Sequence, residues 1–235
     1  MKAYAIVIRG NRISEEGFNK LENSSETVGN QFKINRFDAT TPEQVDHYLI
    51  DNNIEWNWPH QGHVIDNELN IRKIAYGGRN PKRRVACAIS HFRLWKIAAR
   101  GEPILILEHD AEFIEYFDPR FILENSKYNV IGINDPRGAT RLPEKFYSMV
   151  RGNTEQIQPT PIIDNMQIVQ GIAGGSAYII RPEGAVKAIE SVYKYGMWPN
   201  DAQLSIQVLG PNQLGVTRTF YTKVQSLTST TATLL

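Results

Sequence analysis

The chain has 235 residues, of which 41% are hydrophobic and 10% aromatic, and its formal net charge is +1. This length suits one large domain, and the composition is that of a folded globule rather than a disordered or fibrous chain. A charge so close to zero gives no attraction to nucleic acid or to an anionic membrane, and no apolar stretch approaches the roughly 18 residues of a membrane span. We predict no nucleic-acid partner and no transmembrane segment.

The single cysteine, Cys87, cannot form an internal disulfide and lies within a helical pattern. We interpret it as a small core residue in a reducing compartment. The apolar segment at the N-terminus is too short for a signal peptide and lacks a cleavage region. These features predict a cytoplasmic protein.

The first fifty residues alternate between strand and helix patterns. Residues 4–8 form an apolar run typical of a buried strand, and residues 32–37 alternate like a second strand. Ser14 is a suitable N-cap for a helix over residues 14–21, and Thr41 before Pro42 predicts the start of another helix. This β-α-β-α order predicts a parallel sheet.

One strong helix lies between two segments without clear periodicity. Over residues 84–99, apolar side chains recur every three or four positions, which predicts an amphipathic helix that ends before Gly101. Residues 51–80 show no convincing pattern, and residues 134–166 are expected to be extended or mobile.

The last third of the chain returns to regular patterns. The sequence predicts strands over residues 129–133, 176–180 and 214–220, and helices that begin at Pro182 and Asp201, the second capped by Asn200. Residues 226–235 show no packing pattern. We therefore predict one domain over residues 1–225 and a tail over residues 226–235.

A short apolar strand over residues 104–107 ends abruptly in two acids, Glu108 and Asp110, with His109 between them. The C-terminal end of a buried parallel strand lies at the sheet edge where open α/β proteins bind ligands. Two carboxylates at that edge lose favourable hydration when they are buried, and a cation between them compensates for this loss. A divalent metal is the usual cation. The alternative is an acidic loop without metal, because motifs this short often occur by chance.

The residues around these acids resemble the signature of glycosyltransferase family 25, the lipooligosaccharide and collagen galactosyltransferases. The family pattern is G-x-x-G-C-x-x-S-H-x-x-x-W, followed after a short spacer by an apolar stretch and L-E-D-D-A. The matching residues of this chain are Cys87, Ser90, His91, Trp95 and 108–111. His109 stands where the family has Asp, and Arg84 stands where it has a glycine.

The resemblance implies an α/β fold of the GT-A type, with a mostly parallel nucleotide-binding sheet flanked by helices. It also implies an inverting transfer of a hexose, galactose above all, from a UDP-sugar donor to a saccharide or glycan hydroxyl. Weaker matches carry further donor-binding residues over to this chain. These residues are Arg9, Arg12 and Gly175.

A metal would neutralise the charge that develops on the leaving diphosphate. Carboxylates select hard ions, so we expect Mn²⁺ or Mg²⁺ with Asp110 as the direct ligand and Glu108 bound through water or the ribose hydroxyls. His109 would add a nitrogen ligand that favours Mn²⁺. We expect Ser90 and His91 in the donor pocket, with His91 toward phosphate or sugar; the alternative for His91 is helix packing.

An inverting transferase needs a base that deprotonates the acceptor hydroxyl. Asp201, at the start of a predicted helix, is the best candidate, although the helix dipole alone also favours an acid there. Gly175 would let a ligand approach the backbone, but a simple turn explains it equally well.

Two further sets of residues admit two interpretations each. The basic cluster either attracts a diphosphate or an anionic acceptor or is a solvated face; it comprises Arg79, Lys82, Arg83 and Arg84. Three tryptophans either stack on sugar rings or pack in the core; they are Trp56, Trp58 and Trp198. Trp95 lies on the apolar stripe of its helix and is assigned to the core.

Two other functions compete with glycosyl transfer. A catalytically silent protein of the same fold would bind a nucleotide or glycan without turning over a donor. A metal-dependent phosphohydrolase would use Glu108 and Asp110, but it needs a second cluster of metal ligands, which the sequence does not contain.

Overall fold

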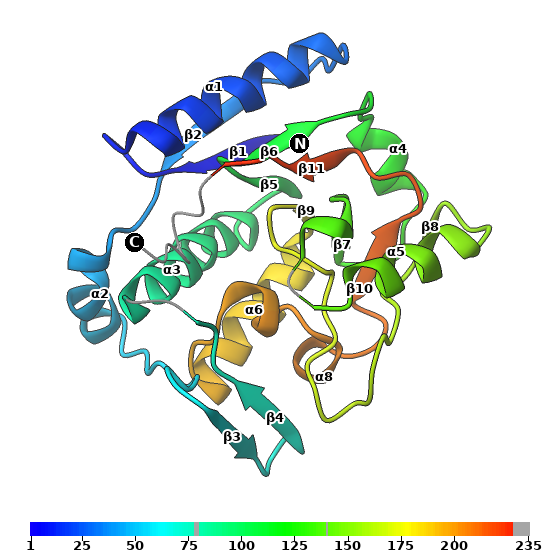
Figure 1. Ribbon diagram of the computed structural model, residues 1–235. Coiled ribbons are helices and arrows are strands. Elements are labelled where there is room, and N and C mark those ends of the chain that lie inside the picture. Colours follow the sequence, from blue (N-terminus) through cyan, green and yellow to red (C-terminus); the bar gives the residue numbers. More distant parts are fainter. Residues whose placement is uncertain (78–79, 140, 228–235) are drawn as a thin grey trace.

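The computed structural model describes residues 1–77, 80–139 and 141–227. Within these ranges the chain forms a seven-stranded sheet in the order β2-β1-β5-β9-β7-β10-β8 (Figure 1). The strands are β1 (Lys2–Val7), β2 (Ile34–Asp38), β5 (Ile104–Glu108), β7 (Val130–Gly132), β8 (Ile157–Pro159), β9 (Ala177–Ile180) and β10 (Leu214–Thr217).

Most of the sheet is parallel in direction. β1 pairs in parallel with β2 and β5, and β7 pairs in parallel with β10. β9 runs antiparallel between β5 and β7, and β8 runs antiparallel to β10 at the edge. All strands except β8 and β9 therefore point the same way, which confirms the predicted α/β class with a mostly parallel sheet.

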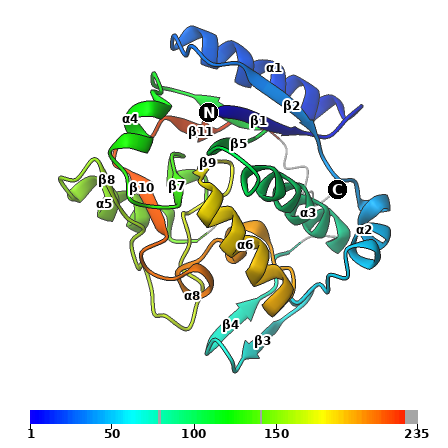
Figure 2. The same ribbon diagram turned by 180° about the vertical axis from the view of Figure 1, so that it is seen from behind.

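Helices cover both faces of the sheet, as the opposite views of Figures 1 and 2 show. α1 (Arg12–Thr27) packs on one face, and α3 (Pro81–Ala98) and α6 (Pro182–Tyr195) pack on the other. The alternation of side chains along β5 assigns its residues to these layers. Leu105 and Leu107 join the core under α1, whereas Ile104 and Ile106 join the core under α3 and α6.

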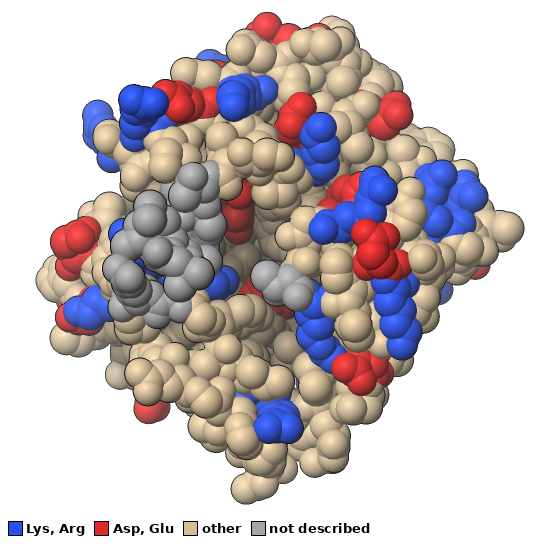
Figure 3. All heavy atoms as spheres, viewed as in Figure 1, with Lys and Arg blue, Asp and Glu red and all other residues tan. Residues whose placement is uncertain are grey.

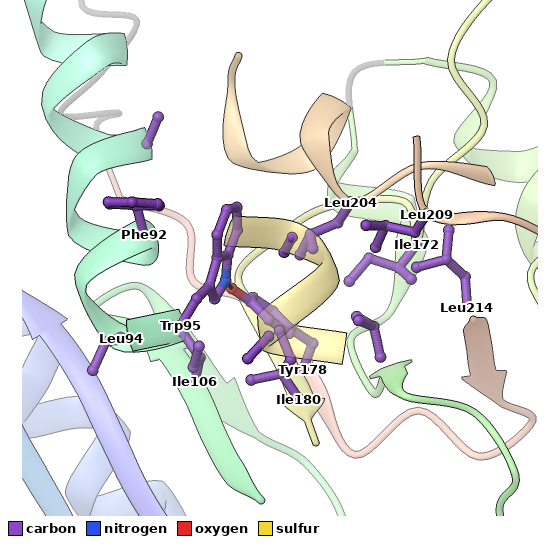
Figure 4. Close-up of a cluster of buried hydrophobic side chains, with 14 of the residues drawn as sticks. Phe92, Leu94, Trp95, Ile106, Ile172, Tyr178, Ile180, Leu204, Leu209 and Leu214 are labelled. Atoms are coloured by element: carbon purple, nitrogen blue, oxygen red, sulfur yellow. Dashed lines mark hydrogen bonds between the residues drawn. The ribbon is translucent and has the colours of Figure 1, made fainter. Parts of the chain in front are cut away.

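The core on the α3 side is close-packed around aromatic residues, which Figure 4 shows in detail. Trp95 is 1% exposed and Tyr178 is fully buried. The assignment of Trp95 to the core is confirmed. Its indole nitrogen points at the Tyr178 hydroxyl, so this core contains a hydrogen bond as well as apolar contacts.

Smaller elements surround this framework. They are η1 (Pro42–Gln44), α2 (Val45–Asp51), β3 (His63–Asp66), β4 (Ile71–Ile74), β6 (Ala111–Phe113), α4 (Pro119–Glu124), η2 (Pro136–Gly138), α5 (Pro143–Gly152), α7 (Asn200–Gln203), α8 (Ile206–Leu209) and β11 (Thr222–Val224). β3 and β4 form a hairpin, and β6 pairs with β11. Within the described residues no helix has the length and apolar character needed to cross a bilayer.

The hairpin of β3 and β4 is fastened to the body by a buried cation. Lys73 forms an ion pair of 2.8 Å with Asp66 and lies 4.1 Å from the centre of the Trp198 ring. Trp58 and Trp198 are buried in this cluster, so core packing is the correct interpretation for both, whereas Trp56 is half-buried.

Several sequence predictions about local structure were wrong. Residues 51–80 contain this hairpin, and residues 134–166 contain α5 and β8. The patterns of these elements are too short to stand out from their polar surroundings, and tertiary contacts stabilise them. The helix predicted from Asp201 is divided into α7 and α8.

The predicted helix caps have mixed outcomes. Ser14 does not cap α1, because Asn11 does so by accepting a hydrogen bond from the Ser14 backbone N–H. Pro42 does begin a helical turn after Thr41, as predicted. Arg79 and most of the predicted tail, residues 228–235, lie outside the described residues.

Candidate active site

The two acids at the end of β5, Glu108 and Asp110, are both half-buried. Figure 3 shows a hollow near the centre of one face of the molecule, with acidic side chains in its wall. The alternation along β5 turns Glu108 toward α3. There the Glu108 Oε1 atom lies 3.1 Å from the His91 Nε2 atom and 3.9 Å from the Cys87 Sγ atom.

Glu108 is held by a buried chain of hydrogen bonds. The Trp95 indole N–H donates to the Tyr178 hydroxyl at 2.8 Å, and that hydroxyl lies 2.8 Å from the His91 Nδ1 atom. Because an indole nitrogen can only donate, the Tyr178 hydroxyl accepts from Trp95. An ionised carboxylate can only accept, so His91 Nε2 donates to Glu108, and in a ring that carries one proton His91 Nδ1 accepts from the Tyr178 hydroxyl. The hydrogen bond from His91 Nε2 holds the pKa of Glu108 below its usual value in spite of burial, which opposes it.

Asp110 has no such support. Its Oδ1 atom is buried and has no hydrogen-bond partner among the described residues. Burial, and then the nearby Glu108 carboxylate, raise the pKa of Asp110 to about 7. An orphaned buried carboxylate oxygen is costly, and it indicates a place for a bound cation or another ligand.

His109 lies on the opposite side of the sheet, because side chains alternate along the strand. It is 8% exposed and packs against α1 at Gly17, where an added Cβ would lie 2.8 Å from the His109 carbonyl oxygen. The structure therefore does not bring His109 together with the group that Glu108 forms with His91 and Cys87.

Cys87 is not the core residue that the sequence predicted. It is partly exposed, and its Sγ atom lies 3.6 Å from the Asn200 Oδ1 atom as well as near Glu108. The ligand atoms of Cys87, His91 and Glu108 all lie within 4.8 Å of one another. Burial, and then the Glu108 carboxylate, raise the pKa of the Cys87 thiol well above its usual value. In the absence of a metal the thiol is therefore protonated.

Gly175 completes the wall of the site. A Cβ at this position would lie 2.4 Å from the Asn200 Nδ2 atom and 4.0 Å from the Glu108 Oε1 atom, so a side chain would displace Asn200. The two preceding residues, Ala173 and Gly174, both have positive φ angles, of 52° and 93°. The close approach of this loop to the Asn200 side chain therefore favours glycine at 175.

Asp201 lies at the start of α7, close to these residues. Its Oδ2 atom accepts a hydrogen bond of 3.2 Å from the Tyr76 hydroxyl, and the Arg84 guanidinium lies 4.4 Å from the centre of the Tyr76 ring. Burial raises the pKa of Asp201, which Arg84 and Tyr76 partly oppose. A carboxylate with a raised pKa is a suitable general base.

Arg9 and Arg12 follow β1 at the same edge of the sheet. Arg9 is 3.7 Å from Asp38, its side chain is 82% exposed, and it lines an open groove of about 600 Å³ with Arg36 and Arg93. Arg12 pairs with Glu16 on the surface of α1.

Ser90 is 1% exposed and forms two internal hydrogen bonds. Its hydroxyl donates to the Ala86 carbonyl and accepts from the Thr40 backbone N–H, so it ties the chain after β2 to α3. His91 likewise uses both ring nitrogens inside the protein. His91 therefore positions Glu108, and Ser90 positions the chain after β2 against α3.

Gln225 is a supporting residue that the sequence did not reveal. Its backbone N–H donates to the Asp110 carbonyl, and its buried amide donates to the carbonyls of Gly17 and Ala111. It thus fixes the loop that carries the acids. No local signal could have identified it, because it is 115 residues away from Asp110 in the sequence.

Comparison with known proteins identifies one family. Residues 11–204 match the model of glycosyltransferase family 25, described as an LPS biosynthesis protein. No curated protein matches the chain. Similar solved structures include the galactosyltransferase LgtC in complex with donor and acceptor sugar analogs, at 10% identity and a TM-score of 0.46 over 91% of this chain and 73% of that one.

Two further similar structures are also distant in sequence. The glycosyltransferase GlyE of Streptococcus pneumoniae TIGR4 has 8% identity and a TM-score of 0.42, over 91% of this chain and 45% of that one. The bifunctional WbbM has 10% identity and a TM-score of 0.44, over 92% and 38%. Likenesses this weak leave the family match as the finding that bears on function.

Proposed function

The chain belongs to glycosyltransferase family 25, and we propose that this enzyme transfers a hexose from a UDP-sugar to a saccharide or glycan hydroxyl in a metal-dependent, inverting reaction. Galactose is the proposed hexose, and the cytoplasm, where a free Cys87 stays reduced, is the proposed location. The observation that carries the proposal is the orphaned Oδ1 atom of Asp110 next to Glu108 at the end of β5.

The residues present fit a hard divalent ion. Asp110 offers an oxygen without a partner, and Glu108 offers a second carboxylate whose orientation is held by His91. Oxygen ligands of this kind suit Mn²⁺ or Mg²⁺. When bound, such an ion neutralises the charge that develops on a leaving diphosphate.

The protein residues supply the remaining chemistry. Asp201, kept partly basic by burial, takes the proton of the acceptor hydroxyl. The hydroxyl oxygen forms a bond to the anomeric carbon on the face opposite the diphosphate, the bond to the diphosphate oxygen breaks, and UDP leaves. We assign Arg9, which lies in a groove beside Asp38, to donor binding, together with Gly175, whose loop lies close to Glu108.

The phosphohydrolase alternative receives no support from the described residues. Among them, one group of three or more candidate ligands is found, and it contains Glu108 itself. A two-metal hydrolase would need a second set of ligands.

Thermal unfolding with UDP, with and without Mn²⁺, tests the donor site. Ligand at a hundredfold excess over its dissociation constant stabilises the folded state by about 2.7 kcal/mol, which is readily measured. We expect a shift that needs both UDP and Mn²⁺, disappears in Asp110→Ala and persists in Asp51→Ala, an exposed acid on α2. No shift at saturating ligand would refute the UDP-metal site.

Product analysis separates transfer from binding alone. We expect UDP release from UDP-galactose with Mn²⁺, and Asp201→Asn should retain the thermal shift but lose UDP release. A thermal shift without release of UDP from any UDP-hexose would favour the catalytically silent alternative.

A further inference from the structure

A narrow aromatic recess lies between the residues before β3 and the start of α3, and Tyr76 in its wall donates a hydrogen bond to Asp201. Four side chains define it: Trp56, His60, Tyr76 and Arg84. Its interior of about 20 Å³ has room for no more than a water, so a sugar ring would lie across its mouth. We propose that the mouth of this aromatic recess is the acceptor subsite and that it recognises a saccharide bearing an anionic group, a phosphate or a carboxylate. The inference rests on the proposed function, because it assumes that Asp201 acts on the acceptor.

The recess presents aromatic faces. The Trp56 and His60 rings are almost parallel, at 7°, with their centres 6.1 Å apart. The Trp56 indole N–H donates to the Trp58 carbonyl, and the Trp58 N–H donates to the Ile74 carbonyl. Both polar edges are therefore satisfied inside the protein, and the half-buried Trp56 ring and the exposed His60 ring stacked on it form an aromatic surface. Aromatic faces of this kind suit the apolar face of a sugar ring.

Arg84 adds a cation without an anionic partner. It is half-buried and lies over the Tyr76 ring, but within the described part of the chain no carboxylate lies within 4.0 Å of it. Lys82, two residues earlier, does pair with an acid, Asp46. Arg84 is joined to the site through Tyr76, since it lies over the Tyr76 ring and the Tyr76 hydroxyl donates to Asp201. A partly desolvated guanidinium with free N–H groups suits a phosphate or carboxylate, which it can bind through two parallel hydrogen bonds.

The recess is connected directly to the proposed base. Tyr76 lies under the Arg84 guanidinium and donates its hydroxyl proton to Asp201. A sugar stacked on Trp56 with its anionic group on Arg84 would therefore lie beside the carboxylate that must take its proton. The three acids of the site would repel such an acceptor, and Arg84 offsets that repulsion.

Arg84 has an alternative role in the site, and the experiment must distinguish the two roles. Arg84 could instead bind the diphosphate of the donor. The recess lies next to the hairpin, whereas the groove of Arg9 lies at the ends of β1 and β2. The two assignments predict different losses when Arg84 is neutralised.

Binding of small saccharides to the full chain tests the proposal. The probes are glucose, glucuronate, glucose 6-phosphate and inorganic phosphate. Their binding is measured by ligand-observed NMR and by tryptophan fluorescence. We expect at least one anionic sugar to bind about tenfold or more tightly than glucose, and the better of the two identifies carboxylate or phosphate. Inorganic phosphate, which lacks a ring to stack, should bind more weakly than glucose 6-phosphate.

Arg84→Gln should abolish this preference, while the matched variant Arg83→Gln, an exposed neighbour on the same helix, should keep it. Arg84→Lys should retain part of it, and its unfolding midpoint verifies that the helix start still folds. His60→Ala should weaken all three sugars alike and leave the charge preference unchanged.

Three results would overturn the inference. Glucose could bind as tightly as both anionic sugars, or Arg84→Gln could leave the preference intact. Alternatively, Arg84→Gln could weaken UDP with Mn²⁺ as strongly as the sugars, which would assign Arg84 to the donor. A normal UDP shift in Arg84→Gln shows that the donor site is intact, so failure of the inference is distinct from failure of the proposed function.

Discussion

The two acids that end β5 lie in opposite environments, although one residue separates them. Glu108 is fixed by His91, which Tyr178 and Trp95 hold from behind, and its pKa is lowered. The Oδ1 atom of Asp110 is buried without a partner among the described residues, and the pKa of this acid is raised to about 7. The difference teaches that the fold supplies a hydrogen-bond donor to one acid and, within the described part of the chain, none to the buried oxygen of the other.

The largest expected effect concerns the unsatisfied acid. Asp110→Asn should reduce UDP release from UDP-galactose by about a hundredfold or more, since one group that stabilises transition-state charge is worth this much. The assay runs at saturating Mn²⁺, with Asp51→Asn as the matched control. Activity within a fewfold of the parent protein would mean that Asp110 is not a metal ligand.

Removal of His91 should eliminate the hydrogen bond that stabilises the Glu108 carboxylate. His91→Ala leaves the buried Glu108 carboxylate without its donor, and we expect a loss of about 2–3 kcal/mol in the free energy of unfolding. Urea unfolding at pH 7 measures it. The loss should shrink toward pH 4, because burial without the His91 donor makes Glu108 of the variant take up a proton more readily. A loss that is equal at both pH values would trace the effect to packing alone.

The pH dependence of stability should separate the two acids. Because the folded pKa of Asp110 is raised from 3.8 to about 7, the folded state holds a proton that the unfolded state has lost between these values. Stability from this group therefore falls as the pH rises from 4 to 7. Asp110→Asn should remove this cost. The gain in unfolding free energy from the substitution should therefore be larger at pH 8 than at pH 5, by on the order of 2 kcal/mol. Glu108, with a lowered pKa, has the opposite sign. Its stabilisation is lost as the pH falls through its folded pKa.

The smallest effect is expected at the far end of the hydrogen-bond chain. Tyr178→Phe removes the acceptor of the Trp95 indole and the donor to His91, and it should cost about 1–2 kcal/mol of unfolding free energy. Trp95→Phe in the same background should then cost less than it does alone, because the two residues share one hydrogen bond. A double-mutant cycle by urea unfolding measures this coupling, and strict additivity would contradict the proposed chain.

Much of the framework could be predicted from local patterns. The strand over residues 104–107, the helix over residues 84–99 and the β-α-β-α start each have a long or strongly apolar pattern, and all of them exist in the structure, the helix as Pro81–Ala98. The hairpin of β3 and β4 could not be predicted, since its stability comes from Lys73 and Trp58 packing with Trp198, far away in the sequence. The helix α5 was missed within a stretch rich in proline and polar residues.

The candidate site could be predicted from the sequence only in part. The acids Glu108 and Asp110 could be found because they interrupt an apolar strand. Because successive side chains of a strand point to opposite faces, the sequence could also have predicted that His109 lies on the other face from the two acids. Only the packing of His109 on Gly17 establishes it. Cys87 looked like a core residue, because a helical stripe does not reveal which part of it opens toward the end of a neighbouring strand.

The sequence by itself determined that an acid-tipped buried strand follows a Ser-His helix in an α/β sheet, and hence the family. Short-range periodicity and motif spacing contain that information. Only the tertiary structure decided which acid is satisfied, that Gln225 fixes the acid loop, and that Arg84 and Tyr76 lie beside Asp201. These contacts join segments many residues apart in the chain, and their distances arise from the packing of helices against the sheet rather than from any local pattern.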